Sequence, residues 1–480
     1  MPAASPRIKG LVIAAPNSGS GKTTLTLALL AALKARGFSL APFKAGPDFI
    51  DPGHHTRITR TVSRNLDGWM LGREINREIF ARGCRDAELA VVEGVMGLFD
   101  GFSGADEAGS TAQMAKWLNL PVLLVVDAKS MARSFAALVK GFCEFDPGLR
   151  IAGVVANKVA GERHFQYLRE AVAGYGVPLL GGIPREATIE IPDRHLGLYT
   201  ADDHVLSANA VRQLGDLVEK HMDLDALLDG LPEVKTDRSP PAAPPVPDVR
   251  IGVARDKAFC FYYEDNLDCL RQQGCETVFF SPLTDAALPP DLDGLYLGGG
   301  YPELFSRELE ENTAMRRSIK TLAESGMPVY AECGGFMYLC RKLLTRDGTA
   351  CQMAGVFPFE TRMQDRLSAL GYREIRLLTD TPLGPAAMIA RGHEFHYSKF
   401  VIHEPPFDRS DEKTDEIKAV YGSTDRSGAD RGCPGWLKNQ CLGSYVHLHF
   451  LSCPQAAAHF AAACRSYKDR KGQAPCSRTR

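Results

Sequence analysis

Residues 8–36 read IKGLVIAAPNSGSGKTTLTLALLAALKAR, and this stretch decides the fold of the first half of the chain. The apolar run at residues 8–15 is typical of a buried strand. Residues 24–36 have the pattern of a long helix, and Gly37 suits its carboxyl-terminal cap. The glycine-rich stretch between them runs from Pro16 to Thr24. A strand, such a turn and a helix in this order predict a loop that binds phosphate.

The residue types in this turn explain the prediction. Glycines let backbone N–H groups converge on an anion, and the amino terminus of the helix adds a favourable dipole. Lys22 is placed to reach the β- and γ-phosphates, and the Thr23 hydroxyl is placed to coordinate Mg²⁺. Pro16 stands where the GxxxxGK[ST] pattern has its first glycine, so a turn that binds nothing is the alternative. The candidate nucleotide-binding residues of the turn are Gly19, Ser20, Gly21, Lys22, Thr23 and Thr24.

Two later segments carry the carboxylates that a metal site needs. Residues 44–55 read KAGPDFIDPGHH, and residues 91–101 read VVEGVMGLFDG. Mg²⁺ takes carboxylates together with phosphate oxygens, and Glu93 ends an apolar run, at the sheet edge where ligands gather. The candidate metal ligands are Thr23, Asp48, Asp51 and Glu93, with a helix cap or a solvated turn as the alternative for each carboxylate. Lys44 is a further nucleotide-binding candidate, whereas the histidine pair at residues 54–55 is interpreted as a surface turn without a metal.

The rest of the sequence alternates short β-branched runs with helical patterns. Further strands are expected at residues 89–93, 122–127, 151–157, 251–255, 277–280, 294–297 and 328–331. Apolar strands separated by helices indicate parallel sheets buried on both faces. The predicted fold class is therefore α/β, with two doubly wound parallel-sheet domains joined by a Pro-rich linker. The order of the strands is not predicted.

Prolines mark the division between the two halves. Five of the eight residues 240–247 are proline, which lacks the backbone donor that a helix or a central strand needs. We therefore expect domains at residues 1–230 and 249–465, a semi-extended linker at residues 231–248, and a frayed polar tail at residues 466–480.

Composition excludes several classes of protein. The 480 residues are 45% apolar and 24% charged, which excludes a mainly disordered chain. With 56 basic and 58 acidic side chains, the net charge of −2 predicts no nucleic-acid or membrane surface through bulk charge. No apolar run approaches the roughly 18 residues of a membrane span, and residues 1–9 lack the layout of a signal peptide. Thirteen cysteines without a CxxC pair indicate a reduced, cytoplasmic protein.

The second half carries a candidate cysteine nucleophile. Residues 329–339 read VYAECGGFMYL, so Cys333 lies on a sharp turn from a strand into a helix, whose amino terminus is expected to lower the thiol pKa. The segment LGGGYPE at residues 297–303 ends another strand. The backbone N–H groups expected to form an oxyanion hole are those of Gly299, Gly300 and Gly334. The segment SYVHLHF at residues 444–450 offers two imidazoles as the base, and a core thiol is the alternative for the cysteine.

These motifs together resemble the family of cobyrinic acid a,c-diamide synthases, which are glutamine-dependent, ATP-using enzymes of corrin (vitamin B12) biosynthesis. The resemblance covers nearly all of residues 7–465. It rests on the segments quoted above and on GYRE at residues 371–374 and RGHEFHYS at residues 391–398. The first half is also similar to dethiobiotin synthetase, and the second half to a class I glutamine amidotransferase domain of the cobyric acid synthase type. The resemblance implies an ATP-dependent amidoligase domain at residues 1–230 and an amidotransferase domain at residues 249–465.

The resemblance also implies a reaction. ATP, with Mg²⁺, phosphorylates the a and c side-chain carboxylates of cobyrinic acid, and Cys333 releases ammonia from L-glutamine to replace the phosphate. The family motif favours His447 over His449 as the base. Most class I members follow the catalytic histidine with Pro-Glu, which is missing here, so the third member of the catalytic group is left open.

Further residue roles follow only from the resemblance. Similarity to dethiobiotin synthetase places Asn157 at the adenine. Arg391 and His393 are candidates for binding the carboxylates of the macrocycle.

Several alternatives stay open. The same chemistry on hydrogenobyrinic acid or nickel sirohydrochlorin fits the motifs equally well, and cobyric acid synthase is a more distant rival. A non-enzymatic ATPase switch with an inactive glutaminase-like domain is opposed by the intact Cys333 and its two histidines. The order of amidation and the oligomeric state are not predicted, and a homodimer is left open.

Overall fold

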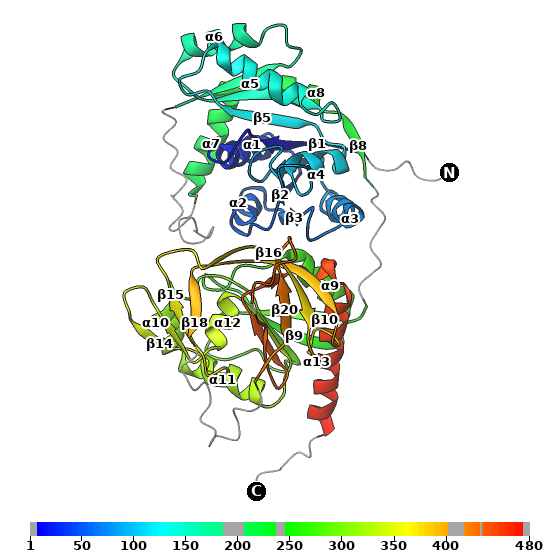
Figure 1. The fold of residues 1–480 in the computed structure, drawn as a ribbon, viewed down its shortest axis with the longest axis vertical. Helices are drawn as coiled ribbons and strands as arrows, with labels where there is room; N and C mark the ends of the chain where they lie inside the picture. Colours follow the sequence, from blue (N-terminus) through cyan, green and yellow to red (C-terminus); the bar gives the residue numbers. More distant parts are fainter. Residues whose placement is uncertain (1–6, 186–205, 237–244, 402–416, 433, 474–480) are drawn as a thin grey trace, which may run out of the picture. The chain divides into compact units, whose positions relative to one another are not determined.

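The computed structural model describes residues 7–185, 206–236, 245–401, 417–432 and 434–473 (Figure 1). The chain divides into two compact units, Met1–Pro240 and Pro241–Arg480. Each unit is built around its own parallel sheet, so the α/β prediction is confirmed for both. No helix in the described ranges is long and apolar enough to cross a membrane.

The first unit holds a parallel sheet with the strand order β3-β2-β4-β1-β5-β6-β7. The bounds are β1 Arg7–Ala14, β2 Leu40–Ala45, β3 Arg64–Leu66, β4 Leu89–Glu93, β5 Val122–Asp127, β6 Ile151–Val159 and β7 Leu179–Pro184. The central strands are buried along nearly their whole length, as a sheet covered on both faces requires. The connections place the carboxyl ends of β1, β2 and β4 side by side, and the residues of the candidate site follow these ends.

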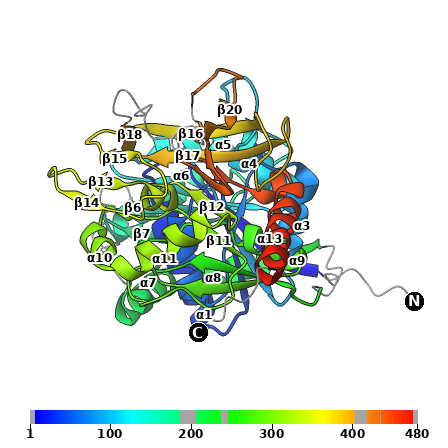
Figure 2. The ribbon, with the colours of Figure 1, turned by 90° about the horizontal axis from the view of Figure 1, so that it is seen from below.

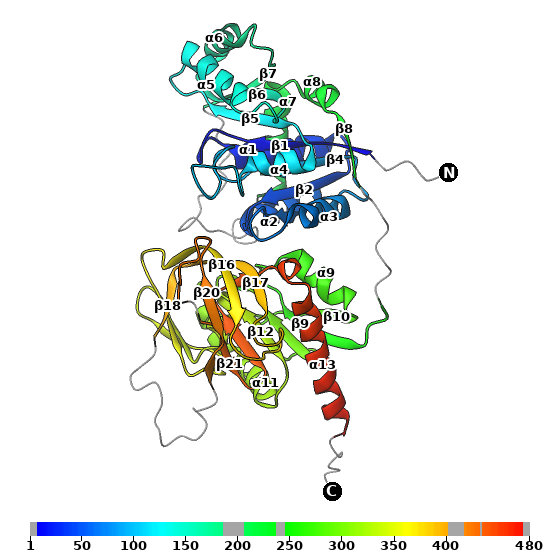
Figure 3. The same cartoon turned by 45° about the vertical axis from the view of Figure 1, so that its right-hand side comes forward.

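Helices cover this sheet (Figure 3). They are α1 Lys22–Ala35, α2 Ile50–Thr59, α3 Arg73–Gly83, α4 Thr111–Leu118, α5 Arg133–Glu144, α6 Glu162–Val172, α7 Ala208–His221 and α8 Leu224–Gly230. Helix α1 packs against α2 and α7, whereas α5 packs against α6 and α3 against α4. Leucine and alanine fill α1 between residues 25 and 33, and this apolar composition matches its position between the sheet and other helices.

The second unit has a central sheet with the order β10-β9-β11-β12-β22-β21-β19. Its parallel strands are β9 Val249–Ala254, β10 Cys275–Phe280, β11 Gly294–Leu297, β12 Val329–Glu332 and β22 Cys441–Ser444; the antiparallel strands are β19 Lys418–Ala419 and β21 Trp436–Lys438. The helices are α9 Glu264–Gln272, α10 Ser306–Glu311, α11 Thr313–Glu324, α12 Gly334–Leu339 and α13 Gln455–Gln473. Helices α9 and α13 lie side by side (Figure 2).

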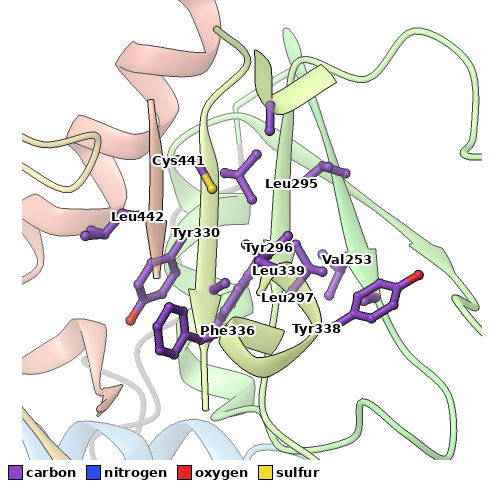
Figure 4. Packing of buried hydrophobic residues seen from close by; sticks show 14 of the residues in the cluster. Val253, Leu295, Tyr296, Leu297, Tyr330, Phe336, Tyr338, Leu339, Cys441 and Leu442 are labelled. Atoms are coloured by element: carbon purple, nitrogen blue, oxygen red, sulfur yellow. The ribbon is translucent and has the colours of Figure 1, made fainter. Parts of the chain in front are cut away.

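Two smaller sheets complete the second unit, and the sequence did not predict them. One has the order β14-β13-β15-β18 and the other β20-β16-β17-β23. Their strands are β13 Lys342–Leu344, β14 Ala350–Gln352, β15 Glu360–Met363, β16 Ala369–Leu377, β17 Ile389–His396, β18 Ser398–Val401, β20 Tyr421–Thr424 and β23 His447–Leu448. Side chains from β9, β11, β12, β22 and α12 meet in the core beside them (Figure 4).

The predicted linker and tail are wrong in part. Strand β8, Glu233–Lys235, pairs antiparallel with β1 and buries Val234, so the first residues of the expected linker belong to the sheet of the first unit. Helix α13 continues to Gln473 because Tyr467 is buried and its hydroxyl contacts Ser325, whereas a frayed tail was expected from residue 466. Most of the proline-rich stretch, residues 237–244, and the end of the tail, residues 474–480, lie outside the described residues.

Candidate functional site

The glycine-rich loop connects β1 to α1 and is shaped for an anion. Gly19 and Gly21 have φ angles of +81° and +98°, which favour glycine, and Gly21 stands at the start of α1. The Ser20 hydroxyl donates to Asn17 Oδ1 at 2.9 Å. No side chain of the described residues caps the start of α1, so its first N–H groups are left for a ligand. Thr24 lies in the first turn of the same helix.

Lys22 lies folded over this loop. Its ammonium donates to the carbonyl oxygens of Asn17 and Met96, so the loop after β4 and the loop after β1 are held together at one cation. Burial and the neighbouring ammonium of Lys44 lower the pKa of Lys22. These two carbonyl contacts are weak compared with phosphate contacts, and a nucleotide phosphate is a partner that this cation can take instead.

Three side chains contact the buried carboxylate of Glu93 at the end of β4, namely Thr23, Lys44 and His55. Glu93 Oε1 accepts from the Thr23 hydroxyl at 2.6 Å and from Lys44 Nζ at 2.8 Å, and Lys44 also contacts Asp51 Oδ2 at 2.6 Å. The other Glu93 oxygen lies 2.8 Å from His55 Nε2. These contacts bring Thr23, Lys44, Asp51 and Glu93 together at one edge of the sheet, where the sequence analysis expected them. Their chemical roles stay predictions.

His55 was missed. It was expected in a surface turn, but residues 50–59 form helix α2 and both His54 and His55 are buried. Asp51 and His55 are four residues apart, so a helix brings them to one face. Recognising the helix in residues 50–59 would have revealed this side chain.

The carboxylates of the cluster stabilise the buried ammonium of Lys44. Burial works to lower the pKa of Lys44, but the carboxylates of Asp51 and Glu93 outweigh it and raise that pKa. Asp48 accepts from the backbone N–H groups of Ile50 and Asp51 at 2.7 and 3.2 Å, at the start of α2, and its role as a metal ligand stays a prediction. Within the described residues no three histidine, cysteine or acidic side chains form a ready metal site.

Asn157 supports the loop from β6. Its amide donates to the Ser20 carbonyl at 2.9 Å, and its side chain fills the space where a side chain at Gly21 would lie. Lys158 continues this contact by pairing with Asp127 Oδ2 at 2.7 Å. This position beside the loop gives Asn157 a role in shaping the loop, and its predicted contact with adenine stays a prediction.

The second candidate site is centred on Cys333, between β12 and α12. Cys333 has φ +45° and ψ −105°, a backbone conformation that is costly for a residue with a side chain, and its N–H donates to Ser444 O at 2.7 Å. Strain of this kind is typical of a nucleophile elbow. The expected lowering of the thiol pKa is wrong: burial, followed by the charge of Glu303, raises the pKa of Cys333. Helix α12 is short, and its first N–H alone does not offset this loss of solvent.

The three predicted oxyanion glycines gather at this elbow, but one is already paired. A side chain at Gly299 would meet the His447 ring at 2.3 Å, and one at Gly334 would meet the Gly300 nitrogen at 3.0 Å. The Gly299 N–H donates to Phe261 O at 3.2 Å through a short antiparallel bridge, which corrects its prediction as an oxyanion donor. Gly300 and Gly334 stay as the predicted donors.

His447 lies in β23, and Glu332 faces it from the end of β12. The distance from His447 Nδ1 to Glu332 Oε2 is 3.7 Å, and both side chains are almost fully buried. Glu332 also accepts from the Tyr330 hydroxyl at 2.6 Å and the Tyr296 hydroxyl at 3.0 Å. Burial and the Glu332 charge raise the pKa of both tyrosines, so their hydroxyls stay protonated and donate. Nothing in the sequence alone pointed to Glu332 except its place beside Cys333.

The other histidines have different surroundings. His393 pairs with His447 across β17 and β23, and the rings stack with centroids 4.9 Å apart. Its Nδ1 lies 2.8 Å from the Tyr263 hydroxyl, and burial and the nearby His447 lower its pKa. His393 is buried, and its predicted contact with macrocycle carboxylates stays a prediction. Arg391 pairs with Glu374 at 2.9 Å on the same hairpin, and His449 packs on the Tyr263 ring.

The two units and the whole chain match known proteins. Residues 11–198 match the CobQ/CobB/MinD/ParA nucleotide binding domain, and residues 250–455 match the CobB/CobQ-like glutamine amidotransferase domain. A cobyrinate a,c-diamide synthase of Syntrophotalea carbinolica is 46% identical over 95% of this chain and 98% of its own. A cobyrinate a,c-diamide synthase of Priestia megaterium is 40% identical over 97% of this chain and 99% of its own. A hydrogenobyrinate a,c-diamide synthase of Streptomyces coelicolor is 42% identical over 95% of this chain and 97% of its own.

Proposed function

The chain belongs to the family of cobyrinate a,c-diamide synthases, and we propose that it amidates the a and c side-chain carboxylates of cobyrinic acid with ATP and L-glutamine. One observation carries the proposal. A single chain holds a charged phosphate loop in one unit and a strained, buried cysteine elbow in the other. We place the enzyme in the cytoplasm, where its co-substrates are made.

In the first unit, the loop binds the ATP phosphates through the N–H groups at the start of α1. Lys22 leaves its two carbonyl partners and contacts the β- and γ-phosphates, where it stabilises the charge that develops during transfer. The γ-phosphoryl group passes to a side-chain carboxylate of the corrin ring, giving an acyl phosphate. Lys44, held by Asp51 and Glu93, keeps a second fixed positive charge near the reacting groups.

The residues beside the loop fit a Mg²⁺ ion. The Thr23 hydroxyl and the Glu93 carboxylate are hard oxygen donors that already contact each other, and Mg²⁺ takes few protein ligands when phosphate oxygens are present. When bound there, Mg²⁺ would offset the negative charge of the phosphate oxygens. Asp51 is a less suitable ligand because it is paired with Lys44.

In the second unit, Cys333 attacks the side-chain amide carbon of glutamine. His447 accepts the thiol proton and passes it to the leaving nitrogen, so that ammonia departs and a thioester to Cys333 forms. The N–H groups of Gly300 and Gly334 stabilise the negative oxygen of the tetrahedral intermediate. Water then cleaves the thioester to release glutamate, and ammonia displaces phosphate from the acyl phosphate to form the amide.

A second substrate is favoured by a specific comparison. The Streptomyces coelicolor relative is named for hydrogenobyrinate, and it is about as similar to this chain as the cobyrinate enzymes. The macrocycle of this chain's substrate is therefore a corrin with cobalt or without it, carrying the same peripheral carboxylates.

The test is an assay of amide formation by mass spectrometry. Purified protein is incubated with ATP, Mg²⁺ and glutamine, and separately with cobyrinic acid or hydrogenobyrinic acid. We expect two successive mass changes, each corresponding to replacement of a carboxylate by an amide, and a dependence on both ATP and glutamine. Absence of product with both corrins, together with unaltered glutamine, would overturn the proposed function.

A further inference from the structure

We infer that Glu332 is the carboxylate that positions His447 for ammonia release, a role that the sequence left unassigned. The inference rests on the proposed glutaminase reaction at Cys333. The usual place for this carboxylate, two residues after the histidine, holds His449 in this chain. Glu332 instead precedes the nucleophile directly, at the end of β12, and its Oε2 lies 3.7 Å from His447 Nδ1.

Three hydrogen-bond donors hold the side chain of Glu332 in position. Tyr330, Tyr296 and the backbone N–H of Leu448 all donate to its carboxylate, at 2.6, 3.0 and 3.0 Å. A carboxylate that accepts three hydrogen bonds in a buried site is held in one orientation. Because the Leu448 N–H belongs to the residue after His447, the same carboxylate fixes the backbone of β23 as well as facing the ring.

Asn266 holds the backbone of β23 and of the residues after it. Asn266 in α9 donates to Leu448 O at 2.7 Å and accepts from Phe450 N at 2.7 Å. Among the contacts of the described residues with the His447 ring, Glu332 faces it from β12 at 3.7 Å and His393 stacks on it from β17. Of these two side chains, Glu332 is the one whose carboxylate can stabilise an imidazolium.

The chemistry that follows is specific. With Nδ1 facing Glu332, the Nε2 atom of His447 is the one that takes the proton from the Cys333 thiol and gives it to the departing ammonia. The imidazole is positively charged only between these two transfers, and Glu332 stabilises it then without accepting a proton. Burial raises the pKa of Cys333, so the thiol does not ionise by itself and depends on this base.

The 3.7 Å separation is longer than a hydrogen bond. A catalytic hydrogen bond is often long without substrate and tightens in the reacting complex. The contact therefore acts by charge and orientation, and we expect a smaller effect than the roughly 10⁴-fold loss found for such a carboxylate in a serine protease.

The test compares two buried glutamates of the second unit. Glu332→Gln keeps the shape and an accepting oxygen but removes the charge. The matched control, Glu360→Gln, removes the charge of a buried glutamate that pairs with Arg341 at 2.9 Å, away from the elbow. We expect Glu332→Gln to lower kcat for glutamine hydrolysis by a factor on the order of 10². The KM for glutamine should change less than about threefold, and ammonia-dependent synthesis should be retained.

The possible outcomes are separable. A glutaminase kcat for Glu332→Gln close to wild type, or an equal loss in Glu360→Gln, would overturn the inference. If Glu332→Gln does not fold, Glu332→Asp serves, because it keeps the charge; turnover in the aspartate variant as low as in Cys333→Ala would reject a role for the charge. Failure of the wild-type protein to release ammonia from glutamine would instead overturn the proposed function itself.

Discussion

The two candidate sites are both buried, but burial has opposite results for the ionisation of their side chains. Around Glu93 in the first unit, the ammonium of Lys44 lies within 2.8 Å of two carboxylates, and these carboxylates keep Lys44 protonated although burial works against its charge. Around Cys333 in the second unit, close to the Glu332 carboxylate, burial instead favours the neutral forms of two side chains, the Cys333 thiol and the His393 imidazole. It raises the pKa of the Cys333 thiol and lowers that of His393.

This difference corresponds to the two reactions. Transfer of a phosphoryl group moves charge that is already present, so fixed charges arranged before the reaction stabilise it most. Attack of a thiol on an amide starts from neutral groups and creates charge only when a proton moves to the base. A thiol stored in its neutral form is also protected from oxidation and from reaction with other electrophiles. If the two sites work separately, a change in one should leave the reaction of the other intact.

The largest expected effect is on the neutral site alone. We predict that Cys333→Ala lowers glutamine-dependent amidation by a factor on the order of 10⁵ or more, as loss of a covalent nucleophile does. Amidation with added ammonium salts should continue, because the first unit still makes the acyl phosphate. A folded variant that also fails with concentrated ammonia would show that the two sites are not separable in this way.

The next effect removes a charge from the ionised site. We predict that Lys22→Ala lowers synthesis by a factor on the order of 10³ with glutamine and with ammonia alike, because phosphoryl transfer precedes both. Glutamine hydrolysis measured without corrin should continue at its basal rate. Near-normal ammonia-dependent rates in this variant would mean that the glycine-rich loop is not the ATP site.

A smaller effect is expected when a negative charge is removed from the ionised site. Glu93→Gln keeps the size of the side chain but leaves Lys44 balanced by Asp51 alone. We predict a fall in kcat for ammonia-dependent synthesis on the order of 10², with little change in nucleotide affinity, since charge moves in the transition state.

The alternative for Glu93 is a structural role, and one sample decides between the two. A structural contact worth about 1 kcal/mol would lower the melting temperature and leave turnover per folded molecule intact. Measuring melting and turnover together, with Glu88→Gln on the surface of the same unit as the control, separates these results. A destabilised variant with normal specific turnover would sink the predicted role.

The fold was predictable where the chain pattern is local. The predicted bounds of β4, β5 and β11 match the observed strands residue for residue. Each is a short run between turns, and such a run is a strong local signal for a buried strand. The two smaller sheets of the second unit were missed. The strands β16 and β17, for example, mix exposed and buried residues and contain no strong apolar run. The pairing of β8 with β1 joins residues far apart in sequence, and no local pattern reports such a contact.

Site residues that belong to a sequence motif could be predicted. Residues whose role depends on contacts in the folded chain could not. The loop, Glu93 and Cys333 came from motifs. His55 and Glu332 did not, because each acts through a partner from another strand or helix. The pKa of Cys333 was predicted in the wrong direction because the sequence shows the helix after it but not the burial around it. Loss of solvent outweighs one short helix.

The smallest effect concerns Glu303, whose negative charge adds to burial in raising the pKa of the Cys333 thiol. Burial raises the pKa of Glu303 to about 7, although Arg346 and a backbone N–H work in the opposite direction. The ordinary pKa of this carboxyl group is 4.5. Between pH 4.5 and about pH 7, Glu303 is therefore protonated in the folded protein and ionised in the unfolded chain. The free energy of unfolding contributed by this group therefore falls as pH rises from about 4.5 to about 7, and stays constant above that.

Glu303→Gln removes this titration, and we predict that the variant is more stable than wild type at pH 8 and equal to it near pH 4. Solvent reaches part of the Glu303 side chain, so we expect a gain of about 1 kcal/mol, less than the full shift would give at 1.4 kcal/mol per unit. Calorimetry of both proteins from pH 4 to pH 8, following the transition of the second unit, measures this difference. Parallel profiles across the whole range would mean that burial does not hold Glu303 neutral. The contrast between an ionised and a neutral site would then rest on Cys333 and its histidines alone.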